Sequence, residues 1–434
     1  NELSYLILDI YDEIGIYNPK IQIKVNYNTP DKLLFKVFNM IRNGRNSFAL
    51  CCEPGMIRAV MSYGATYKEA LGMDIRGCYE TGVRANEVSA VTGYVNAAKA
   101  VEYVFNNGYD TEIKKQIGIK SGELTELKTF EDFYSAVLRQ WSALIELTID
   151  VSLSYEKYLS RINPSNMYSA TVEHALKCGR DAYQSGVKFN NSALLNCGFA
   201  TLVDSIMAVK EFVYDKKSVT IEELKSALDQ NWSGFEDLHT QITKSSRKYG
   251  NDNPEADMYA EALSAFFASK VNNRPNARGG VYKAIMHTAL VFVWGGQKTK
   301  ATPDGRYAGE EISKNGSPSA GMDKNGVTAL INSAVKTKPY TYCESYCLDV
   351  MLHPSAVSGD DGPEIMKSLL FTYMKNGGQS IQFNVFNTEM LKDAQKHPDK
   401  YKNLQVRVCG WNVLWNNLSA AEQNAYIKRS ENIL

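Results

Sequence analysis

The chain has 434 residues, of which 44% are hydrophobic and 22% are charged, as in an ordinary globular protein. Lysine plus arginine and aspartate plus glutamate each number 48, so the formal net charge is zero and nothing indicates a polyanion-binding surface. No apolar run reaches membrane-spanning length, and no signal-peptide pattern opens the chain. Eight cysteines without a small-domain disulfide framework favour a reducing compartment, so we expect a cytoplasmic protein.

The first residues already carry a helical pattern. Leu3, Leu6, Ile7, Ile10 and Ile14 recur at the spacing of one helix face, and the chain begins with Asn and not with Met. A helix that is in mid-course at the first residue leads us to expect that this chain is a piece of something longer.

Strands and helices alternate through the first hundred residues, which favours an α/β fold with a parallel sheet or barrel. Short β-branched or apolar runs predict strands at 21–25, 47–52 and 73–80, and a helix is predicted over 95–108 with an Asn-Asn-Gly stop. Chemistry in such folds lies at the carboxyl ends of the strands. Cys78 and Glu80 lie at the expected end of the third strand.

The rest of the chain changes character twice. Residues 129–271 are predicted to be mostly helix, with apolar stripes that we interpret as packing surface. From residue 276 onward Gly, Pro and Asn become frequent, which predicts long ordered loops. Two strands at 380–386 and 404–410, separated by a short helix, precede a helix that closes the chain.

Conventional catalytic patterns find no support. The five histidines are not paired at metal-ligand spacing. Cys343 and Cys347 are four residues apart but have no second Cys/His pair nearby, so we interpret them as core residues. The Gly-Gly pairs lack phosphate-loop spacing, and no Ser-His-Asp order is convincing. Hydrolase and kinase chemistry are therefore not indicated.

Three motifs remain: a Gly-Cys-x-Glu turn, a Thr-Pro-Asp-Gly-Arg segment and a glycine strand near the end. The third lies in "SIQFNVFNTEMLKDAQKHPDKYKNLQVRVCGWNVLW", and the second begins "KTKATPDGRYAGEEISKNGSPSAGMDKNG". Together they resemble the glycyl radical enzymes, the superfamily of pyruvate formate-lyase and of the diol, glycerol and choline lyases. The resemblance spans nearly the whole chain and is weakest in the helical middle.

This resemblance implies the C-terminal half of a ten-stranded α/β barrel with surrounding helices. Residues 1–300 would form the second half-barrel, including the helical middle at 129–271, and residues 301–434 the glycyl radical domain. Gly410 would store the radical. A backbone radical is stabilised when its Cα flattens beside the adjoining amides, and only glycine lacks a Cβ that would crowd this arrangement. The first half of such barrels, which supplies much of the substrate pocket, has no counterpart here.

Two cysteine sites compete for the thiyl radical that attacks the substrate. Adjacent Cys51 and Cys52 resemble the cysteine pair of pyruvate formate-lyase, and Cys78 resembles the cysteine of the eliminating and decarboxylating members. Cys78 falls on the loop that follows the strand and helix, as in the family, whereas the pair falls on the earlier strand. We therefore assign Cys78 as the thiyl residue and interpret Cys51 and Cys52 as packed thiols.

Glu80 matches the glutamate that serves as general base or acid in the lyase members. The commonest family pattern is Gly-Cys-Val-Glu-Pro, but here Tyr79 replaces the Val and Thr81 replaces the Pro. These departures change the loop beside the substrate. Trp411 in place of the usual Tyr is a milder change, because it is another flat aromatic residue.

The resemblance implies a lyase that eliminates water or another leaving group from a small hydroxylated substrate. A pyruvate formate-lyase-type acyltransferase, a decarboxylase and a non-catalytic subunit or repair piece remain as alternatives. It also implies an anaerobic homodimer without a bound cofactor or metal. A separate radical-SAM activase, carrying S-adenosylmethionine and a 4Fe-4S cluster, would install the radical. Neither nucleic acid nor a membrane is expected as a partner.

Overall fold

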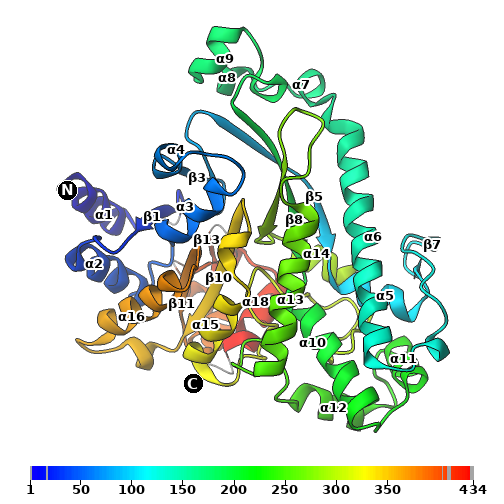
Figure 1. The fold of residues 1–434 in the computed structure, drawn as a ribbon. Coiled ribbons are helices and arrows are strands. Elements are labelled where there is room, and N and C mark those ends of the chain that lie inside the picture. The colour runs from blue at the N-terminus through cyan, green and yellow to red at the C-terminus, as the bar shows by residue number, and fades with distance from the viewer. Residues whose placement is uncertain (1, 16–17, 403, 408–411, 431–434) are drawn as a thin grey trace.

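The computed structural model describes residues 2–15, 18–402, 404–407 and 412–430 (Figure 1). Its centre is a seven-stranded sheet with the strand order β1-β2-β11-β10-β9-β8-β5. The strands are β1 (Ile21–Val25), β2 (Phe48–Cys52), β5 (Glu87–Asn96), β8 (Phe189–Cys197), β9 (Tyr282–Met286), β10 (Ser345–Leu352) and β11 (Ser380–Val385). None of the described helices combines the length and apolar character that crossing a membrane requires.

The sheet joins two parallel units. Strands β5, β8, β9, β10 and β11 pair in parallel, and so do β1 and β2. The seam between β2 and β11 is antiparallel, with Ser380 opposite Cys51 and Ile381 opposite Leu50. The predicted α/β class with a parallel-rich sheet is confirmed.

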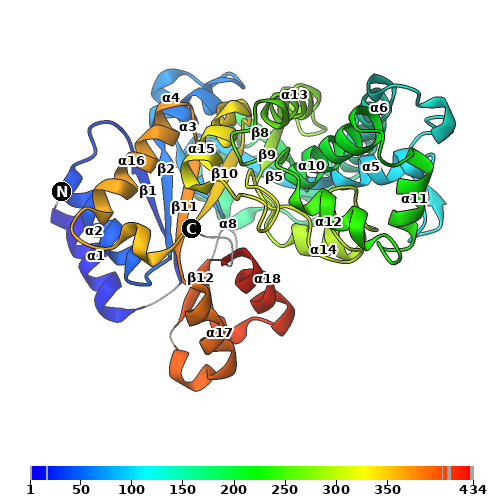
Figure 2. The same cartoon turned by 90° about the horizontal axis from the view of Figure 1, so that it is seen from below.

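A layer of helices covers one face of this sheet (Figures 1 and 2). Neighbouring helices contact one another in the order α2, α16, α15, α13, α10, α5 and α6. These are α2 (Asp31–Arg42), α16 (Gly362–Lys375), α15 (Gly326–Lys336), α13 (Pro254–Val271), α10 (Phe199–Val209), α5 (Ala98–Phe105) and α6 (Phe130–Glu156). α6 begins where Thr129 accepts a hydrogen bond from the amide of Asp132.

The remaining helices lie at the rim of the sheet or along connecting segments. They are α1 (Glu2–Ile14), α3 (Glu53–Met61), α4 (Tyr67–Leu71), α7 (Leu159–Ile162), α8 (Asn166–Ser169), α9 (Glu173–Cys178), α11 (Ile221–Asp229), α12 (Glu236–Lys244), α14 (Val291–Gln297), α17 (Thr388–Lys396) and α18 (Ala420–Ser430). Three hairpins complete the fold: β3 (Asp74–Arg76) with β4 (Glu80–Gly82), β6 (Tyr109–Asp110) with β7 (Lys115–Gln116), and β12 (Gln405–Arg407) with β13 (Asn412–Leu414).

Alternation along the strands gives the sheet two different faces. In β11, Ile381, Phe383 and Val385 pack in the same apolar cluster as the helices α2 and α16. Because successive side chains point to opposite faces, Gln382 and Asn384 lie on the other face, which we call the inner face. Both are almost fully buried. The inner face is therefore polar and shielded from solvent.

Four strands of the sheet were missed by the sequence analysis. β8 lies inside residues 129–271, which we expected to be mostly helix, and β9 and β10 lie where we expected long loops. β5 precedes the helix expected at 95–108. β8 reads "FNNSALLNC" and is buried on both faces, so it shows neither the polar alternation nor the β-branched run on which strand prediction depends.

The C-terminal residues form a small unit of their own below the sheet (Figure 2). α17, the β12–β13 hairpin and α18 enclose a separate apolar cluster made of Phe386, Leu391, Ala394, Val406, Trp415, Tyr426 and Ile427. We call residues 386–430 the C-terminal unit. Gly410, together with Trp411, lies outside the described residues.

Candidate active site

The predicted thiol lies at the tip of the β3–β4 hairpin. Gly77 has φ +49°, and a Cβ built on it would lie 2.7 Å from Oε2 of Glu80, so a side chain at this position would be strained and crowded. The same Oε2 accepts hydrogen bonds from the amide of Cys78 (2.6 Å) and from the amide of Tyr79 (2.9 Å). The Gly-Cys-x-Glu pattern is thus a turn that Glu80 closes with its own carboxylate.

Residues 73–80 do not form a strand of the main sheet, so the expectation that Cys78 and Glu80 sit at a carboxyl end of that sheet was wrong. The hairpin instead lies over the middle of the inner face. Strand register puts Gln22, Ala49, Gln382 and Asp349 in one row across β1, β2, β11 and β10. Nε2 of Gln22 donates to the carbonyl of Cys78 at 3.1 Å, so the thiol lies above that row.

A buried ion cluster anchors the far strand of the hairpin. Both the amide and the hydroxyl of Thr81 donate to the carbonyl of Glu344, at 2.9 and 2.7 Å. Nζ of Lys283 pairs with Glu87 at 2.6 Å and with the carboxylate of Glu344, and all three side chains are essentially inaccessible. Breaking such a cluster would leave uncompensated buried charge, so the hairpin is held firmly.

Three reactive groups meet at the tip. Sγ of Cys78, a carboxylate oxygen of Glu80 and a ring nitrogen of His287 all lie within 4.8 Å of one another. His287 directly follows β9. We interpret these groups as a reactive site, because a thiol, a carboxylate and an imidazole within reach of one another can exchange protons.

Burial sets the charge state of each group. It raises the pKa of Cys78 to about 11, and the Glu80 carboxylate adds to this effect, so the sulfur is a thiol at neutral pH. Burial opposes ionisation of Glu80, but His287 and the nearby amides outweigh it and hold the pKa of Glu80 below its usual value. Burial also lowers the pKa of His287, against the opposing effect of Glu80. The resting site thus holds a thiol, a carboxylate and a neutral imidazole.

The hairpin also touches the C-terminal unit. The hydroxyl of Tyr79 donates to Oε1 of Gln382, and Nε of Arg407 donates to the same oxygen at 2.6 Å. The guanidinium of Arg407 also lies 5.8 Å from the ring centre of Tyr79. All three side chains are inaccessible to solvent. Arg407 is three residues before Gly410, so this network connects the thiol loop to the strand that leads to the predicted radical glycine.

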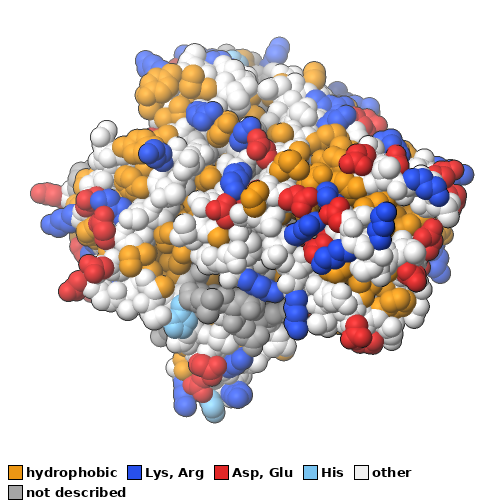
Figure 3. Space-filling view, turned by 60° about the horizontal axis from the view of Figure 1, so that its bottom comes forward, with side chains coloured by type: hydrophobic (Ala, Val, Ile, Leu, Met, Phe, Trp, Pro, Cys, Tyr) orange, Lys and Arg blue, Asp and Glu red, His pale blue; other side chains and the backbone are white. Residues whose placement is uncertain are grey.

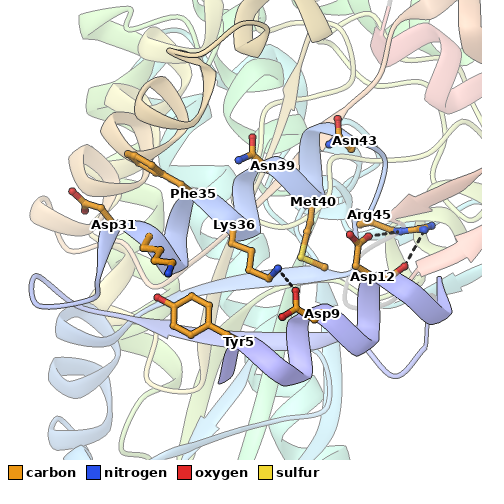
Figure 4. A pocket seen from close by; sticks show the side chains of 11 residues that line it. Tyr5, Asp9, Asp12, Asp31, Phe35, Lys36, Asn39, Met40, Asn43 and Arg45 are labelled. Carbon is orange, nitrogen blue, oxygen red and sulfur yellow. Dashed lines mark hydrogen bonds and ion pairs between the residues drawn. The ribbon is translucent and has the colours of Figure 1, made fainter. Parts of the chain in front are cut away.

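A separate hollow of the surface lies away from the hairpin. A groove of about 1040 Å³ lies between α1 and α2, where Lys36 pairs with Asp9 and Arg45 pairs with Asp12 at 3.2 Å (Figure 4). None of the three reactive groups lines it. Over the face seen in Figure 3, acidic and basic side chains are interspersed, in agreement with the zero net charge. Neither feature competes with the hairpin as a catalytic site.

The other candidate cysteines are core residues in this structure. Cys51 and Cys52 are inaccessible on β2, and burial raises the pKa of Cys51 to about 12. Cys343 and Cys347 are also buried. Sγ of Cys343 lies 2.9 Å from Oγ of Ser62, within hydrogen-bond distance.

Sequence reasoning missed His287. It found no histidine pair and did not consider a histidine beside a cysteine 209 positions away, a separation that follows from their numbers. The available signal was its place directly after the run "YKAIM", where a buried parallel strand ends. The structure brings Cys78 and Glu80 together with this residue.

Two family models match the chain. The model described as "Pyruvate formate lyase-like" covers residues 1–296, and the model described as "Glycine radical" covers residues 312–416. The chain belongs to the glycyl radical enzyme superfamily. Position 410 falls inside the second match.

Several relatives match nearly the whole chain. Trans-4-hydroxy-L-proline dehydratase of Clostridioides difficile is 33% identical over 99% of this chain and 54% of its own length. Isethionate sulfite-lyase of Bilophila wadsworthia is 30% identical over 99% of this chain and 52% of its own. The chain therefore spans about half the length of the curated relatives it matches.

Solved structures agree with this assignment. The crystal structure of hydroxyproline dehydratase from Clostridioides difficile, with trans-4-hydroxy-L-proline bound, superposes with a TM-score of 0.95 at 33% identity. It is matched over 100% of this chain and 55% of its own. The glycerol-bound B12-independent glycerol dehydratase from Clostridium butyricum gives a TM-score of 0.93 at 30% identity, covering 99% of this chain and 54% of that one. The fold of this glycyl radical enzyme is thus that of dehydratases in its family.

Proposed function

We propose that the protein acts as a glycyl radical lyase, which eliminates water or another leaving group from a small hydroxylated substrate. One observation carries the proposal: Sγ of Cys78 and a carboxylate oxygen of Glu80 lie within 4.8 Å of each other at one half-buried hairpin tip. The raised pKa of Cys78 and the lowered pKa of Glu80 favour a thiol beside a carboxylate. A thiol, and not a thiolate, is the form that has a hydrogen atom to give. A carboxylate is the form that accepts a proton.

The proposed reaction begins when a radical at Gly410 takes the hydrogen atom of the Cys78 thiol, which leaves a thiyl radical. The thiyl radical takes a hydrogen atom from the substrate carbon that bears the hydroxyl group, so the S–H bond reforms as the C–H bond breaks. Glu80 then accepts the hydroxyl proton. The resulting ketyl radical forms a carbonyl group as the bond to the leaving group breaks.

The leaving group departs with the bonding electron pair and takes up the one proton that left the hydroxyl. The radical now lies on the adjacent carbon, which recovers a hydrogen atom from Cys78 and regenerates the thiyl radical. Atoms and electrons balance without any further oxidant or reductant. Each turnover therefore consumes substrate alone.

Radical installation falls to a second protein in this proposal. A radical-SAM activase would supply S-adenosylmethionine and a 4Fe-4S cluster, and the C-terminal unit would leave the sheet to present Gly410. The separate apolar cluster of that unit supports such a movement, because the unit keeps its own packing. A homodimer and a cytoplasmic location belong to the same proposal.

The substrates that we propose first carry both a hydroxyl and an acidic group. Isethionate and (2S)-3-sulfopropanediol, which appear in the names of relatives 30% and 28% identical to this chain, have this composition and carry a leaving group on the carbon beside a hydroxyl-bearing carbon, as the reaction above requires. The Lys20 cation acts on both Cys78 and His287. A positive charge near the thiol favours an anionic substrate.

The alternatives have less support in the structure. Acyl transfer through Cys51 and Cys52 would require thiols that a substrate can reach, and both are inaccessible. A decarboxylase remains a second candidate, because indoleacetate decarboxylase of Tractidigestivibacter scatoligenes is 28% identical over 99% of this chain. A non-catalytic repair piece would not need the Cys78–Glu80 tip.

Anaerobic activation followed by EPR spectroscopy and a substrate panel tests the proposal. We expect a glycine-centred doublet in the wild type and none in Gly410→Ala. Cys78→Ser should keep the doublet but lose turnover by at least about 10⁴-fold, the scale for a group that carries the reacting bond. The exposed Cys178→Ser is the matched control. Turnover that survives in Cys78→Ser would overturn the assignment.

Exposure of the activated protein to air provides a second readout. Oxygen should cut the backbone at Gly410 and release a tail of about the last twenty-four residues, the length that follows position 410. Intact mass spectrometry detects this fragment. An uncut chain that had shown a doublet before exposure would place the radical elsewhere.

A further inference from the structure

His287 is held on three sides in the interior of the site. Its side chain is almost fully buried. Nδ1 lies 3.0 Å from Oγ of Ser345, the first residue of β10, and the ring meets the ring of Tyr79 edge to face at 5.9 Å between centres. The side chain therefore has one orientation, and its free ring nitrogen, Nε2, points in a fixed direction.

That direction is toward Glu80. Nε2 of His287 lies 3.6 Å from Oε1 of Glu80. The other carboxylate oxygen, Oε2, accepts the two amide hydrogen bonds that close the turn. The two carboxylate oxygens of Glu80 thus have different roles. Oε2 holds the backbone of the hairpin, and Oε1, which lies beside His287, remains for proton transfer.

We propose that His287 is a positioning residue of the elimination, which exchanges a proton with Oε1 of Glu80 while Ser345 fixes the ring. This inference rests on the proposed lyase function. When Glu80 accepts the substrate hydroxyl proton, Nε2 of His287 takes that proton over and becomes imidazolium. The proton then returns through Glu80 to the leaving group, so one proton moves from hydroxyl to leaving group and none is lost.

This path requires a particular tautomer. Nε2 accepts the proton only if its lone pair faces Glu80, so the ring hydrogen must lie on Nδ1 and be donated to Oγ of Ser345. The 3.6 Å separation must also shorten by several tenths of an ångström, which is usual when substrate closes a site. Both requirements are measurable.

The charges that surround His287 come from several elements. Glu80 on the hairpin favours the imidazolium form, and so does Asp349 on β10, whereas Lys20 before β1 opposes it. Burial is the largest influence and keeps the ring neutral at rest. A neutral imidazole beside a carboxylate is the state that can accept one proton and give it back.

NMR spectroscopy of the unactivated full chain tests the coupling without any substrate. The chain has five histidines, so ¹³C and ¹⁵N labelling of histidine gives few signals, and His287→Gln identifies the relevant one. We expect the Nδ1–H tautomer in the wild type and its loss in Ser345→Ala. Glu80→Gln should lower the pKa of His287 further, by about one unit, because the opposite charge is removed. An unchanged titration of His287 in Glu80→Gln would overturn the proposal.

Kinetics of the activated enzyme separate proton exchange from a structural role. In His287→Gln the acidic limb of the kcat/KM profile should move to lower pH, because the imidazole, which takes up the first proton of the pair on acidification, is gone and Glu80 titrates alone. Ser345→Ala should move it in the same direction by less. A lower kcat/KM with an unmoved limb in both variants means that His287 only packs the site, which rejects the proposal.

The two hypotheses fail in different ways. If no member of the substrate panel is turned over although EPR shows the doublet, the proposed lyase function fails while NMR still reports the coupling. If turnover is normal and His287→Gln leaves both the limb and the doublet unchanged, the lyase function stands and the role of His287 fails.

Discussion

The thiol hairpin and the C-terminal unit are held to the molecule in opposite ways. The hairpin is tied to several strands through backbone hydrogen bonds and a buried ion cluster. The C-terminal unit has its own apolar cluster, against which Met351 of β10 packs, and it also meets the body through polar contacts, among them Arg407 with Gln382 and Asn46 with the carbonyl of Gln405. The thiol hairpin is therefore fixed to the body, whereas the C-terminal unit, which contains the predicted radical glycine, is docked on it.

This difference suits the two tasks. The thiol must present its sulfur to a substrate with sub-ångström reproducibility, which favours a rigid frame. A glycine that another protein must reach needs a unit that can leave and return without unfolding. Four experiments, given from the largest expected effect to the smallest, test how the hairpin and the C-terminal unit are held and how the thiol is protonated.

Removing the Lys283 cation beneath the hairpin should destabilise the anchor of the hairpin and have the largest effect of the four. Lys283→Met leaves Glu87 and Glu344 buried without their partner, so we expect the free energy of unfolding to fall by about 3–5 kcal/mol. Urea unfolding followed by circular dichroism measures this. Lys177→Met, which breaks the exposed pair with Glu173, is the control and should leave stability nearly unchanged. Equal effects of the two substitutions would contradict a firmly anchored hairpin.

Arg407→Met should weaken the attachment of the C-terminal unit to the sheet. It removes charged hydrogen bonds to Gln382 and Tyr79, worth about 1.5–3 kcal/mol, whereas methionine retains much of the apolar volume. Limited proteolysis should cut within residues 386–402 at least tenfold faster, while the global unfolding midpoint changes little. Arg247→Met, which removes a partly exposed arginine from Asp215, should leave the cleavage rate as it is. Unfolding of the whole molecule in step with cleavage would show that the unit is not separate.

The protonation of Cys78 should be visible in its alkylation by iodoacetamide. With the pKa raised to about 11, about one sulfur in a thousand is a thiolate at pH 8, and the rate should rise about tenfold per pH unit up to pH 11. Glu80→Gln removes a negative neighbour, lowers the pKa of Cys78 and should speed alkylation several-fold at pH 8. Peptide mass spectrometry distinguishes Cys78 from the exposed Cys178, the internal reference. A rate that levels off near pH 8 would show that the thiol is not shielded.

The smallest effect is expected for the Tyr79 hydroxyl, which shares the Gln382 oxygen with Arg407 and so links the hairpin to the C-terminal unit. Tyr79→Phe keeps the ring against His287 but loses the hydrogen bond to Gln382, a change of about 1 kcal/mol. Proteolysis of residues 386–402 should accelerate only about fivefold, less than in Arg407→Met. Tyr63→Phe, which loses a buried hydrogen bond to Glu87, is the matched control and should not affect that cleavage. A Tyr79→Phe effect as large as that of Arg407→Met would mean that the arginine acts mainly through the tyrosine.

Much of the site could be predicted from short sequence motifs, but much of the sheet could not. Cys78 and Glu80 are two residues apart, so one local turn brings them together and the motif contains the geometry. His287 reaches the same place through the register of β9 beside β10, and Arg407 reaches it through docking of the C-terminal unit on Gln382. Both depend on long-range pairings that a single sequence does not show. β8 and β10 were missed because strands buried on both faces lack a helical or alternating pattern.

Other expectations remain predictions. The roles of Gly410, Cys78 and Glu80 rest on resemblance and on the chemistry of the hairpin, and Gly410 lies outside the described residues. The division of the chain near residue 300 is likewise a prediction. The family and the α/β fold, by contrast, are established for this chain.

The antiparallel seam between β2 and β11 has a consequence for the position of the thiol. It joins β1 and β2 to β10 and β11 in one sheet, so a single hairpin can contact both parallel units. The thiol hairpin does so, because Gln22 of β1 donates to the carbonyl of Cys78 and the hydroxyl of Tyr79 donates to Gln382 of β11. A displacement of one parallel unit against the other would therefore move the half-buried sulfur, so its place depends on both parts of the sheet.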